Sequence, residues 1–386
     1  MGGNNKILVF ADWYEPGFKA GGPIRSCVNF VRYMRDSHSL YVFTTDRDLG
    51  STEPYDVVTD EWISPGHPDV RIYYCSPGNL SWRSILRRMR EVNPDFIYLN
   101  SMFSTPFTIM PLLITRLYGI RGNIVLSPRG MLRSSALQFK PKKKQVFLKL
   151  FRLLGLHRRI TFHASDVTEM QDVQKHFGAS ASVTMIGNFP AALPEVLTSI
   201  EKRQGELSLV FIGRVHPIKN LDYILKVLKE LRARIHFTIV GSLEDKAYWD
   251  MCSRLIKELP ENVSVEYAGE VPHHGLQEIS VRHHLFVLPT RGENFGHAIF
   301  ESLALGRPVL ISDQTPWRGL EGVHAGWDLS LERPELFRQA MEDAAGFDQE
   351  EYNRWSQSTF RYVQDFVAGS TLRKDYLHLF NQRTEG

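Results

Sequence analysis

The sequence predicts an α/β protein built from two doubly wound units, each with a largely parallel β-sheet. Its 386 residues suffice for two domains of ordinary size. Apolar residues make up 43% of the chain and charged residues 23%, which excludes a disordered, collagen-like or coiled-coil protein. Short runs rich in β-branched and aromatic residues recur with amphipathic segments between them, and this alternation favours parallel strands covered by helices.

The first half predicts strands and helices in alternation. Its first apolar run is too short for a signal peptide or a membrane span, so it predicts a strand. The expected strands are 6–11, 40–44, 70–74, 96–100, 123–127, 161–164 and 183–186. The expected helices are 24–35, 82–92, 107–117, 142–154 and 167–177.

The second half repeats this plan. Its expected strands are 207–212, 235–240, 263–267, 285–289 and 309–312. Its expected helices are 221–232, 248–259, 297–304, 335–345 and 352–367. Apolar residues at near-helical spacing over 371–382 predict a last helix whose apolar face must be covered, and we expect it to pack on the first half.

The expected boundaries place a first domain over 1–190 and a second over 207–368. The stretch 188–205 holds two prolines and a charged run, so we expect a linker over 191–206. The C-terminal segment 369–386 then returns to the first domain. Two such domains imply a central cleft, with ligands at the C-terminal ends of the strands that face it.

Charge is distributed unevenly between the halves. Residues 1–190 contain 24 Lys and Arg against 15 Asp and Glu, which gives +9, while residues 191–386 contain 22 against 28, which gives −6. An anionic partner would therefore favour the first half. Three scattered cysteines are too few for a disulfide framework or a metal site, so we expect a reducing, cytoplasmic location. No apolar stretch reaches ~20 residues, so any expected membrane contact is peripheral.

The strongest chemical signal lies in the segment 289–301, where a strand ends, a loop follows and a helix begins. Glu293 lies in the loop and Glu301 in the helix. Free backbone N–H groups near the helix start favour a phosphate, and two carboxylates can accept hydrogen bonds from hydroxyls. The alternative is that Glu293 only caps the helix and Glu301 belongs to a solvated face.

Two cations follow the first strand of the second half. Arg214 and Lys219 come after that strand and before a helix, where they could neutralise a diphosphate leaving group. The alternative is a pair of surface cations in a loop. In the first half, glycines in the loop 17–25 let the backbone approach a phosphate at the start of the next helix.

The spacing of Glu293 and Glu301 resembles the E-x7-E motif of retaining GT-B glycosyltransferases of the large family numbered four. The segments 302–309 and 211–220 fit the same resemblance, which covers most of the chain and is more specific in the second half. It implies the GT-B fold, with two Rossmann-like lobes that face a central cleft. The first lobe would be the acceptor side, and the second would bind the nucleotide sugar.

The resemblance also implies roles for single residues. Arg214 and Lys219 would bind the donor diphosphate, Glu293 would lie at the donor sugar and Glu301 at the ribose. The base would contact Glu270 and Val271, and Gly22 matches the glycine loop of the first lobe. The remaining residues of the expected donor site are Asn294, Phe295, Gly296 and His297.

One position departs from the family pattern. Many members carry a histidine after the fifth strand, near the reacting sugar. In this chain the corresponding loop is 127–132, and Arg129 stands at about the place of the histidine. Arginine is no base near neutral pH, although it can bind a phosphate or a sugar hydroxyl, so we expect Arg129 in the catalytic site without a general-base role. His163 is a second candidate, and the alternative is a buried, hydrogen-bonded histidine.

No metal or cofactor is expected. Asp46, Arg47 and Asp48 match a short D-x-D pattern that binds a metal in the other glycosyltransferase fold, but we interpret them as a turn. No His, Cys and Asp cluster has the spacing of a metal site.

The segment 140–159 holds eight Lys and Arg and no acid. On a helix, Lys142, Gln145, Lys149 and Arg152 share one face, and an apolar face opposite to it comprises Phe147, Leu150, Phe151 and Leu154. This pattern predicts a basic amphipathic helix. It either packs on the sheet with a solvated basic face or docks on anionic lipid.

The sequence therefore predicts a metal-independent, retaining, hexosyltransferase-type enzyme. It would move a sugar from a UDP- or GDP-sugar to the hydroxyl of a sugar or a lipid-linked acceptor, in polysaccharide or glycolipid assembly. We expect no nucleic-acid partner. The alternatives are another GT-B enzyme, such as a nucleotide-sugar epimerase, and a non-catalytic protein that binds membrane or polyanion.

Overall fold

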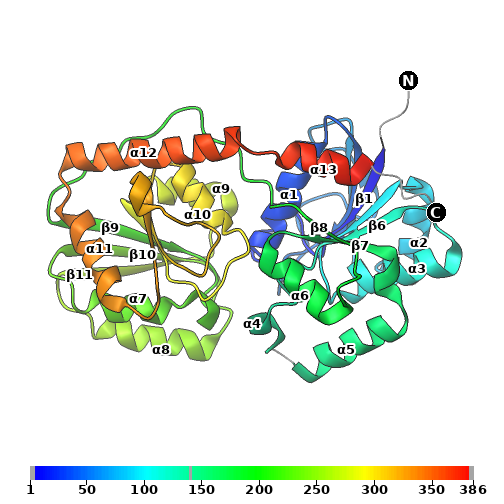
Figure 1. Cartoon of the computed structure of the whole chain (residues 1–386), viewed down its shortest axis with the longest axis horizontal. Coiled ribbons are helices and arrows are strands. Elements are labelled where there is room, and N and C mark those ends of the chain that lie inside the picture. Colours follow the sequence, from blue (N-terminus) through cyan, green and yellow to red (C-terminus); the bar gives the residue numbers. More distant parts are fainter. Residues whose placement is uncertain (1–4, 139–140, 382–386) are drawn as a thin grey trace. The chain divides into compact units, whose positions relative to one another are not determined.

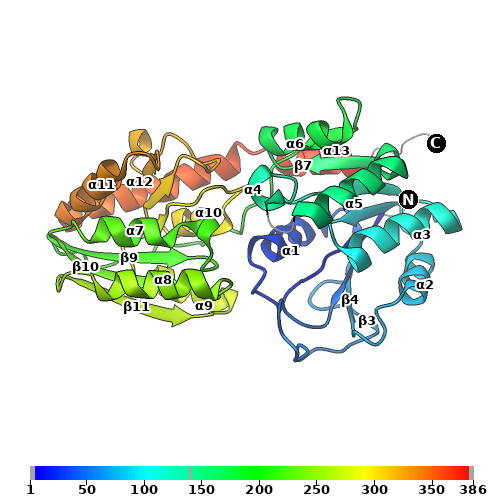
Figure 2. The same ribbon diagram turned by 90° about the horizontal axis from the view of Figure 1, so that it is seen from below.

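The computed structural model describes residues 5–138 and 141–381. The chain divides into two compact units, one formed by the residues up to Phe189 with the segment from Thr371 onward, the other by Pro190–Ser370. Each unit contains a twisted sheet with helices on both faces (Figures 1 and 2). The α/β fold class predicted from the sequence is confirmed in both units.

The sheet of the first unit has the strand order β3-β4-β2-β1-β5-β6-β7-β8. Neighbouring strands pair in parallel, except that β3 runs antiparallel to β4. The strands are β1 (Lys6–Phe10), β2 (Ser39–Thr45), β3 (Trp62–Ile63), β4 (Val70–Cys75), β5 (Phe96–Leu99), β6 (Asn123–Leu126), β7 (Ile160–Ala164) and β8 (Val183–Met185). The helices are α1 (Gly22–Met34), α2 (Trp82–Val92), η1 (Thr105–Ile109), α3 (Met110–Tyr118), α4 (Ser134–Leu137), α5 (Pro141–Leu153), η2 (Leu156–Arg159), α6 (Val167–Phe177) and α13 (Leu372–Asn381).

Both faces of this sheet are buried, as β1 illustrates. Ile7 and Val9 belong to one apolar cluster and Leu8 and Phe10 to another, because successive side chains of a strand point to opposite faces. Residues of α1 and α13 join the first cluster, and residues of α2, α3, α5 and α6 join the second. A continuous apolar run therefore forms the strand, as in other parallel sheets covered on both sides.

The C-terminal segment, expected to return to the first half, forms α13 and packs in that unit. Tyr376 and Phe380 are buried, and both rings lie against Phe30, at centroid distances of 5.6 and 5.3 Å. The Tyr376 ring also stacks on Phe189 at 4.4 Å. The helix thus completes one face of the first core. Residue 382, the end of the expected segment, lies outside the described residues.

The second unit has a parallel sheet in the order β11-β10-β9-β12-β13-β14. Its strands are β9 (Glu206–Ile212), β10 (Arg234–Val240), β11 (Val263–Gly269), β12 (Leu285–Leu288), β13 (Val309–Ser312) and β14 (Gly326–Leu329). Its helices are η3 (Pro217–Lys219), α7 (Leu221–Leu228), α8 (Lys246–Lys257), α9 (His273–Ser280), α10 (His297–Ala304), η4 (Glu321–Val323), α11 (Pro334–Gly346) and α12 (Gln349–Ala368).

Strand order sets a switch point in each sheet. In the first unit β1 lies between β2 and β5, and in the second unit β9 lies between β10 and β12. Connections that leave two such neighbouring strands run to opposite faces of the sheet, which opens a crevice at the C-terminal ends of the strands. The loops after β9 and β12 therefore flank the natural ligand position of the second unit.

Several short elements were not predicted, namely β3, α4, α9, β14 and the one-turn helices η2, η3 and η4. Each is too short for a hydrophobic period to show, and α9 begins with two histidines and a glycine. The expected helix 221–232 ends early, at Leu228. Lys229 still has helical dihedral angles, but the next residues form turns whose apolar side chains, such as Leu231, are buried.

The stretch expected as a linker is partly built into the second unit. Lys202 is buried, and its ammonium group donates hydrogen bonds to the carbonyls of Arg203, Ala345 and Phe347 at 2.8–2.9 Å. Burial lowers the pKa of Lys202 to about 8. A buried ammonium group must be hydrogen-bonded, and these carbonyls satisfy it. Lys202 therefore anchors the charged run to the second unit.

The apolar face predicted for the basic helix is wrong in two positions. Leu148 and Phe151 of α5 are buried, but Leu150 and Leu154 are exposed. The helix is rotated relative to the predicted face, because Leu148, between the predicted positions, points into the core with Phe151. Lys140 lies outside the described residues.

Among residues 5–138 and 141–381, no helix has the length and apolar character that crossing a bilayer requires. Cys27, Cys75 and Cys252 are buried free thiols. Burial raises the pKa of Cys27 to about 11.

Candidate functional site

The loop after β9 carries the two predicted cations. Its backbone approaches the end of β10 so closely that a Cβ atom on Gly241 would lie 2.0 Å from the Gly213 carbonyl oxygen. A parallel bridge between Val215 and Leu243 continues this contact. The loop then forms η3 and enters α7 through Asn220, whose φ of 60° is left-handed. Lys219 is therefore held on a short, well-anchored turn at the end of β9.

The loop after β12 is fastened to the loop after β9. The backbone N–H of Arg291 donates to the Ile218 carbonyl at 2.7 Å, and the Thr290 hydroxyl donates to the same carbonyl at 3.1 Å. The backbone N–H of Glu293 donates to the Gln314 carbonyl, in the loop after β13, at 3.1 Å. These bonds bring three strand ends together around the switch point of the second unit.

Lys219 and Glu293 form an ion pair at this switch point, and we call them the switch-point pair. Their side chains are only 16% and 14% exposed, so the pair is largely shielded from water. Most ion pairs at a protein surface are exposed and weakly held, whereas in this pair both side chains are held in place with little contact to water. The structure thus brings one predicted phosphate-binding cation into contact with the carboxylate predicted at the donor sugar.

The second predicted cation has a different partner. Arg214 donates a hydrogen bond to Glu244, from the loop after β10, at 2.5 Å. Both side chains are more than a third exposed. Arg214 therefore lies on the same strand-end edge as the switch-point pair, but in contact with water and able to turn toward a ligand at low energetic cost.

The start of α10 supplies backbone donors next to the loop of Glu293. Gly296 precedes the helix with a φ of 76°, a left-handed conformation that favours glycine. The carbonyl of buried Phe295 accepts a hydrogen bond from the Trp317 indole N–H at 2.5 Å. No acidic side chain lies in the first turn of α10, and His297 there is buried. This helix start can receive an anion.

Glu301, the second predicted carboxylate, points to α9. Its Oε1 atom lies 3.0 Å from Nε2 of His273, the first residue of that helix. Of the other predicted donor-site residues, Glu270 is exposed, Asn294 is partly buried, and Val271 packs on the apolar core. Glu270 and Val271 precede α9, so the same short segment carries the predicted base contacts and the partner of Glu301.

In the first unit, Gly22 begins α1 and is exposed. The loop before it is held by the Asp48 carboxylate, which accepts hydrogen bonds from the backbone N–H groups of Phe18, at 2.7 Å, and Lys19. Asp46 pairs with Arg47 at 2.9 Å. The D-x-D pattern thus forms a bend that fixes the glycine loop, and the described residues contain no group of three or more potential metal-ligating side chains.

Arg129 lies after β6 with a φ of 54°, a left-handed conformation that is rare outside glycine and recurs at functional sites. Its guanidinium donates hydrogen bonds to the Tyr98 hydroxyl at 2.9 Å, to Asn100 Oδ1 at 2.6 Å and to Asn188. Three oxygen acceptors therefore fix the side chain near the switch point of the first unit. Its catalytic role stays a prediction.

His163 is buried and hydrogen-bonded, the alternative considered for it from the sequence. The Ile186 carbonyl can only accept, so Nε2–H of His163 donates to it at 2.8 Å, and the Tyr98 hydroxyl donates to the unprotonated Nδ1 at 2.8 Å. Burial, with the nearby Arg129 charge, lowers the pKa of His163 to about 3. A neutral imidazole that is hydrogen-bonded through both ring nitrogens supports the Arg129 network structurally.

Sequence reasoning missed four residues beside these positions. Glu244 and His273 pair with predicted residues, buried Glu169 accepts a hydrogen bond from the Gly130 backbone at 2.5 Å, and Asp12 accepts one from the Ser104 hydroxyl at 2.6 Å. Burial raises the pKa of Asp12. Asp12 could have been predicted as a site residue, because it follows the first apolar run directly. The other three lie in a loop or at the start of a helix, where no sequence pattern marks them.

Comparison with protein families finds a match within the second unit. Residues 206–344 match the family model of glycosyl transferases group 1, and this stretch contains Arg214, Lys219, Glu293 and Glu301. A comparison with curated proteins finds no significant match. The resemblance inferred from the sequence is confirmed at the level of the group 1 type.

Solved structures give the fold of the whole chain. The Anabaena protein HepE, in a crystal structure with UDP-glucose, is similar with a TM-score of 0.67 at 14% identity, over 98% of this chain and 100% of that one. Sucrose-phosphate synthase from Thermosynechococcus elongatus is similar with a TM-score of 0.69 at 13% identity, over 98% of both chains. WaaG, a glycosyltransferase involved in lipopolysaccharide biosynthesis, gives 0.61 at 12% identity, over 98% of this chain and 100% of that one.

The two sheets and these similarities define a protein of the GT-B glycosyltransferase fold. Most of its second unit matches the family model of glycosyl transferases group 1.

Proposed function

We propose that this protein is a metal-independent, retaining hexosyltransferase that moves a sugar from a nucleotide-diphosphate sugar to an acceptor hydroxyl. The switch-point pair carries the proposal. It combines a cation for a diphosphate with a carboxylate for sugar hydroxyls, at the crevice position of the unit that matches group 1 glycosyltransferases.

In the proposed step, the bond between the anomeric carbon and the diphosphate oxygen breaks while the acceptor oxygen bonds to the same face of that carbon. The departing phosphate oxygen takes the acceptor proton, so no side chain acts as nucleophile. Lys219, Arg214 and the start of α10 stabilise the negative charge that develops on the diphosphate. Glu293 holds sugar hydroxyls and Glu301 holds the ribose.

The finer assignments are part of the same proposal. UDP-sugars are the first donors to test, because the similar HepE structure contains UDP-glucose, and GDP-sugars are the second. The acceptor would be a sugar or a lipid-linked sugar in polysaccharide or glycolipid assembly, which is also the setting of the similar WaaG. A cytoplasmic location with a peripheral contact to anionic membrane completes it, on the basis of the acid-free basic segment 140–159.

A donor screen tests the function. We expect one nucleotide sugar to raise the melting temperature, and the purified protein to transfer its sugar with retained anomeric configuration, as read by NMR of the product. Transfer should persist in EDTA, because the described cations take the place of a metal ion. Loss on chelation with rescue by Mn²⁺ would contradict metal independence, and UDP release without any glycoside product would favour an epimerase.

Replacing Glu301 with alanine should weaken nucleotide binding about 5- to 150-fold, because the ribose hydroxyls lose a charged acceptor worth ~1–3 kcal/mol. Calorimetry with the nucleoside diphosphate of the accepted donor measures the effect. Glu278, exposed on α9, provides the matched control, and Glu278→Ala should leave affinity unchanged. Unchanged affinity in a folded Glu301→Ala protein would remove the ribose role.

A further inference from the structure

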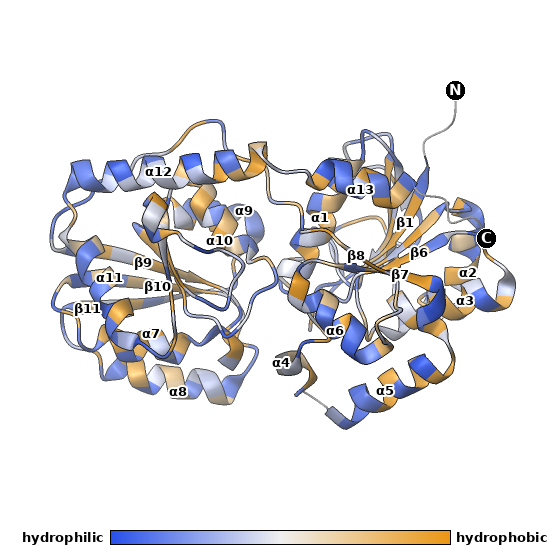
Figure 3. Cartoon of the chain, in the orientation of Figure 1, coloured by the Kyte–Doolittle hydropathy of each residue, from blue (hydrophilic) through white to orange (hydrophobic). Residues whose placement is uncertain are grey.

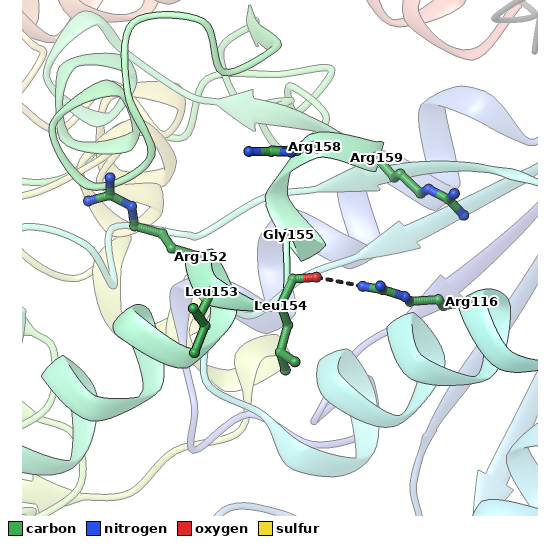
Figure 4. A pocket seen from close by; sticks show the side chains of 7 residues that line it. All are labelled: Arg116, Arg152, Leu153, Leu154, Gly155, Arg158 and Arg159. Atoms are coloured by element: carbon green, nitrogen blue, oxygen red, sulfur yellow. Dashed lines mark hydrogen bonds between the residues drawn. The ribbon is translucent and has the colours of Figure 1, made fainter.

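A hollow lined by four arginines lies in the first unit. It measures about 300 Å³ and is bordered by Leu153, Leu154 and Gly155 besides the arginines (Figure 4). Arg116 comes from α3, Arg152 from α5, and Arg158 and Arg159 from η2. We call this feature the arginine hollow, defined by Arg116, Arg152, Arg158 and Arg159.

A hydrogen bond from Arg116 to the backbone connects two of the elements that line the arginine hollow. Nη1 of Arg116 donates a hydrogen bond to the Leu154 carbonyl at 2.5 Å, which joins the end of α3 to the end of α5 (Figure 4). Within the described residues, no ion pair involves any of the four arginines. Their field acts on His157, whose pKa is lowered by burial and by Arg158 and Arg152. An anion would relieve this concentration of positive charge.

The surrounding sequence offers no internal anion. Residues 96–165 contain 12 Lys and Arg and no Asp or Glu. Guanidinium groups are weakly hydrated and present paired N–H donors that match phosphate oxygens, so a cluster of them selects phosphate groups over most other anions.

An apolar stripe on α5 leads into the arginine hollow. Val146, Leu150, Leu153 and Leu154 are 57%, 50%, 83% and 49% exposed, and they follow helical spacing along one outer side of α5. Figure 3 shows hydrophobic and hydrophilic residues side by side on this helix. Four large apolar side chains on a solvent-facing helix are costly unless something apolar covers them. The stripe is bordered by the exposed cations Lys142, Lys143, Lys149 and Arg152.

Within the first unit, the arginine hollow and the candidate-site residues Arg129 and Gly22 lie at opposite ends of the strands. The end of α3 and the whole of η2 come shortly before β6 and β7, so they lie at the N-terminal ends of these strands. Arg129 and the loop before Gly22 follow strands and lie at the C-terminal ends. A phosphate in the arginine hollow is therefore separate from both Arg129 and the glycine loop.

We propose that the arginine hollow binds the phosphate of an anionic phospholipid headgroup while the stripe Val146, Leu150, Leu153 and Leu154 enters the acyl region. The proposal rests on the peripheral membrane contact proposed above and names its site. Charge complementarity identifies the partner, because an acid-free basic segment and an exposed apolar stripe together match an anionic lipid surface and no water-soluble phosphate.

Vesicle sedimentation of the full chain tests the site. Vesicles of phosphatidylcholine alone are compared with an equimolar mixture of phosphatidylcholine and phosphatidylglycerol at low salt. We expect the wild type to bind only the mixture, and the triple variant R152Q/R158Q/R159Q to lose affinity on the order of 100-fold, about fivefold per cation near the surface.

Matched variants separate a built site from net charge. R32Q/R83Q/R87Q removes three exposed helix cations of the same unit that do not line the arginine hollow, and it should lose less than about tenfold. Leu153→Ser should weaken binding, whereas Val196→Ser, at another highly exposed apolar residue, should not. Equal losses in the two triple variants, or no effect of Leu153→Ser, would overturn the proposal.

Two further outcomes decide between related possibilities. A wild type that ignores the mixed vesicles but binds glycerol 3-phosphate in calorimetry takes a free phosphate, which overturns lipid docking. Donor turnover with a soluble acceptor, measured on the same preparations, should be equal in wild type and R152Q/R158Q/R159Q. Vesicle binding without any turnover would remove the proposed enzyme function and leave the lipid site standing.

Discussion

Replacing Lys219 with alanine should reduce sugar transfer about 100- to 1000-fold, the usual cost of removing one preorganised group that stabilises developing charge. Lys219 is the shielded cation at the switch point of the second unit, only 16% exposed. In a shielded position its attraction to a departing diphosphate is screened little by water. The effect should fall mainly on kcat, because the charge on the leaving group is greatest in the transition state.

The ion pair with Glu293 allows a sharper test. If Lys219 only neutralised Glu293, the double variant K219A/E293Q would be as active as the single variant E293Q. If Lys219 stabilises the leaving diphosphate, the double variant should be no more active than K219A. A double-mutant cycle on kcat therefore separates the two roles. Recovery of activity in the double variant would contradict the proposed mechanism.

Stability must be followed in the same experiment, because K219A leaves the largely buried carboxylate of Glu293 without its cation. Melting temperatures of K219A and the double variant show whether a loss of activity reflects unfolding. Lys226 provides a matched control, since it pairs with Asp222 at 2.7 Å on α7 of the same unit. K226A should change transfer less than about twofold, because Lys226 is 59% exposed and Asp222 keeps its hydrogen bond from the Tyr248 hydroxyl.

The sequence predicted the switch-point residues because their signals are local. α10 follows a buried strand and a glycine-containing loop, and its predicted range 297–304 agrees with the structure. Lys219 and Glu293 each lie in the loop that follows a strand of a parallel sheet, so both loops meet at one end of the sheet once the two strands are neighbours.

The partners of the other site residues were not predictable in the same way. The contact of Glu301 with His273 depends on α9, a short helix without a clear hydrophobic period. The contact of Arg214 with Glu244 depends on two irregular loops held by a single bridge. Side-chain pairing between loops follows from their three-dimensional course, about which residue spacing along one segment carries no information.

The basic helix shows a different reason for a wrong prediction. Periodicity located α5 to within a residue at each end, but assigned Leu150 and Leu154 to its buried face. Both apolar sides of α5, the buried one with Leu148 and Phe151 and the exposed stripe, contribute to the same periodic signal. A hydrophobic period cannot distinguish a helix side that packs on the protein core from an apolar side that is exposed.

Replacing Phe380 with alanine should destabilise the first unit by about 3–5 kcal/mol, the range for truncating a large aromatic side chain in a core. Phe380 is fully buried, and its ring lies 5.3–5.5 Å from the rings of Phe30, Phe96 and Tyr98. Truncating this ring leaves a cavity among buried aromatic side chains. Such a loss is a large part of the stability of one domain.

Hydrogen–deuterium exchange followed by mass spectrometry is the suitable measurement, because a chain with two units does not unfold in one step. Exchange in F380A should rise in α1, β1 and β5, whose residues share a core with α13, and stay unchanged in β9–β14. Phe366→Ala on α12 is the control, since its ring is 37% exposed and its loss should cost about 1 kcal/mol, confined to the second unit. Unchanged exchange of the first unit in F380A, or an increase spread over both units, would show that α13 does not complete the first core, and deletion of the segment from Thr371 onward should then be tolerated.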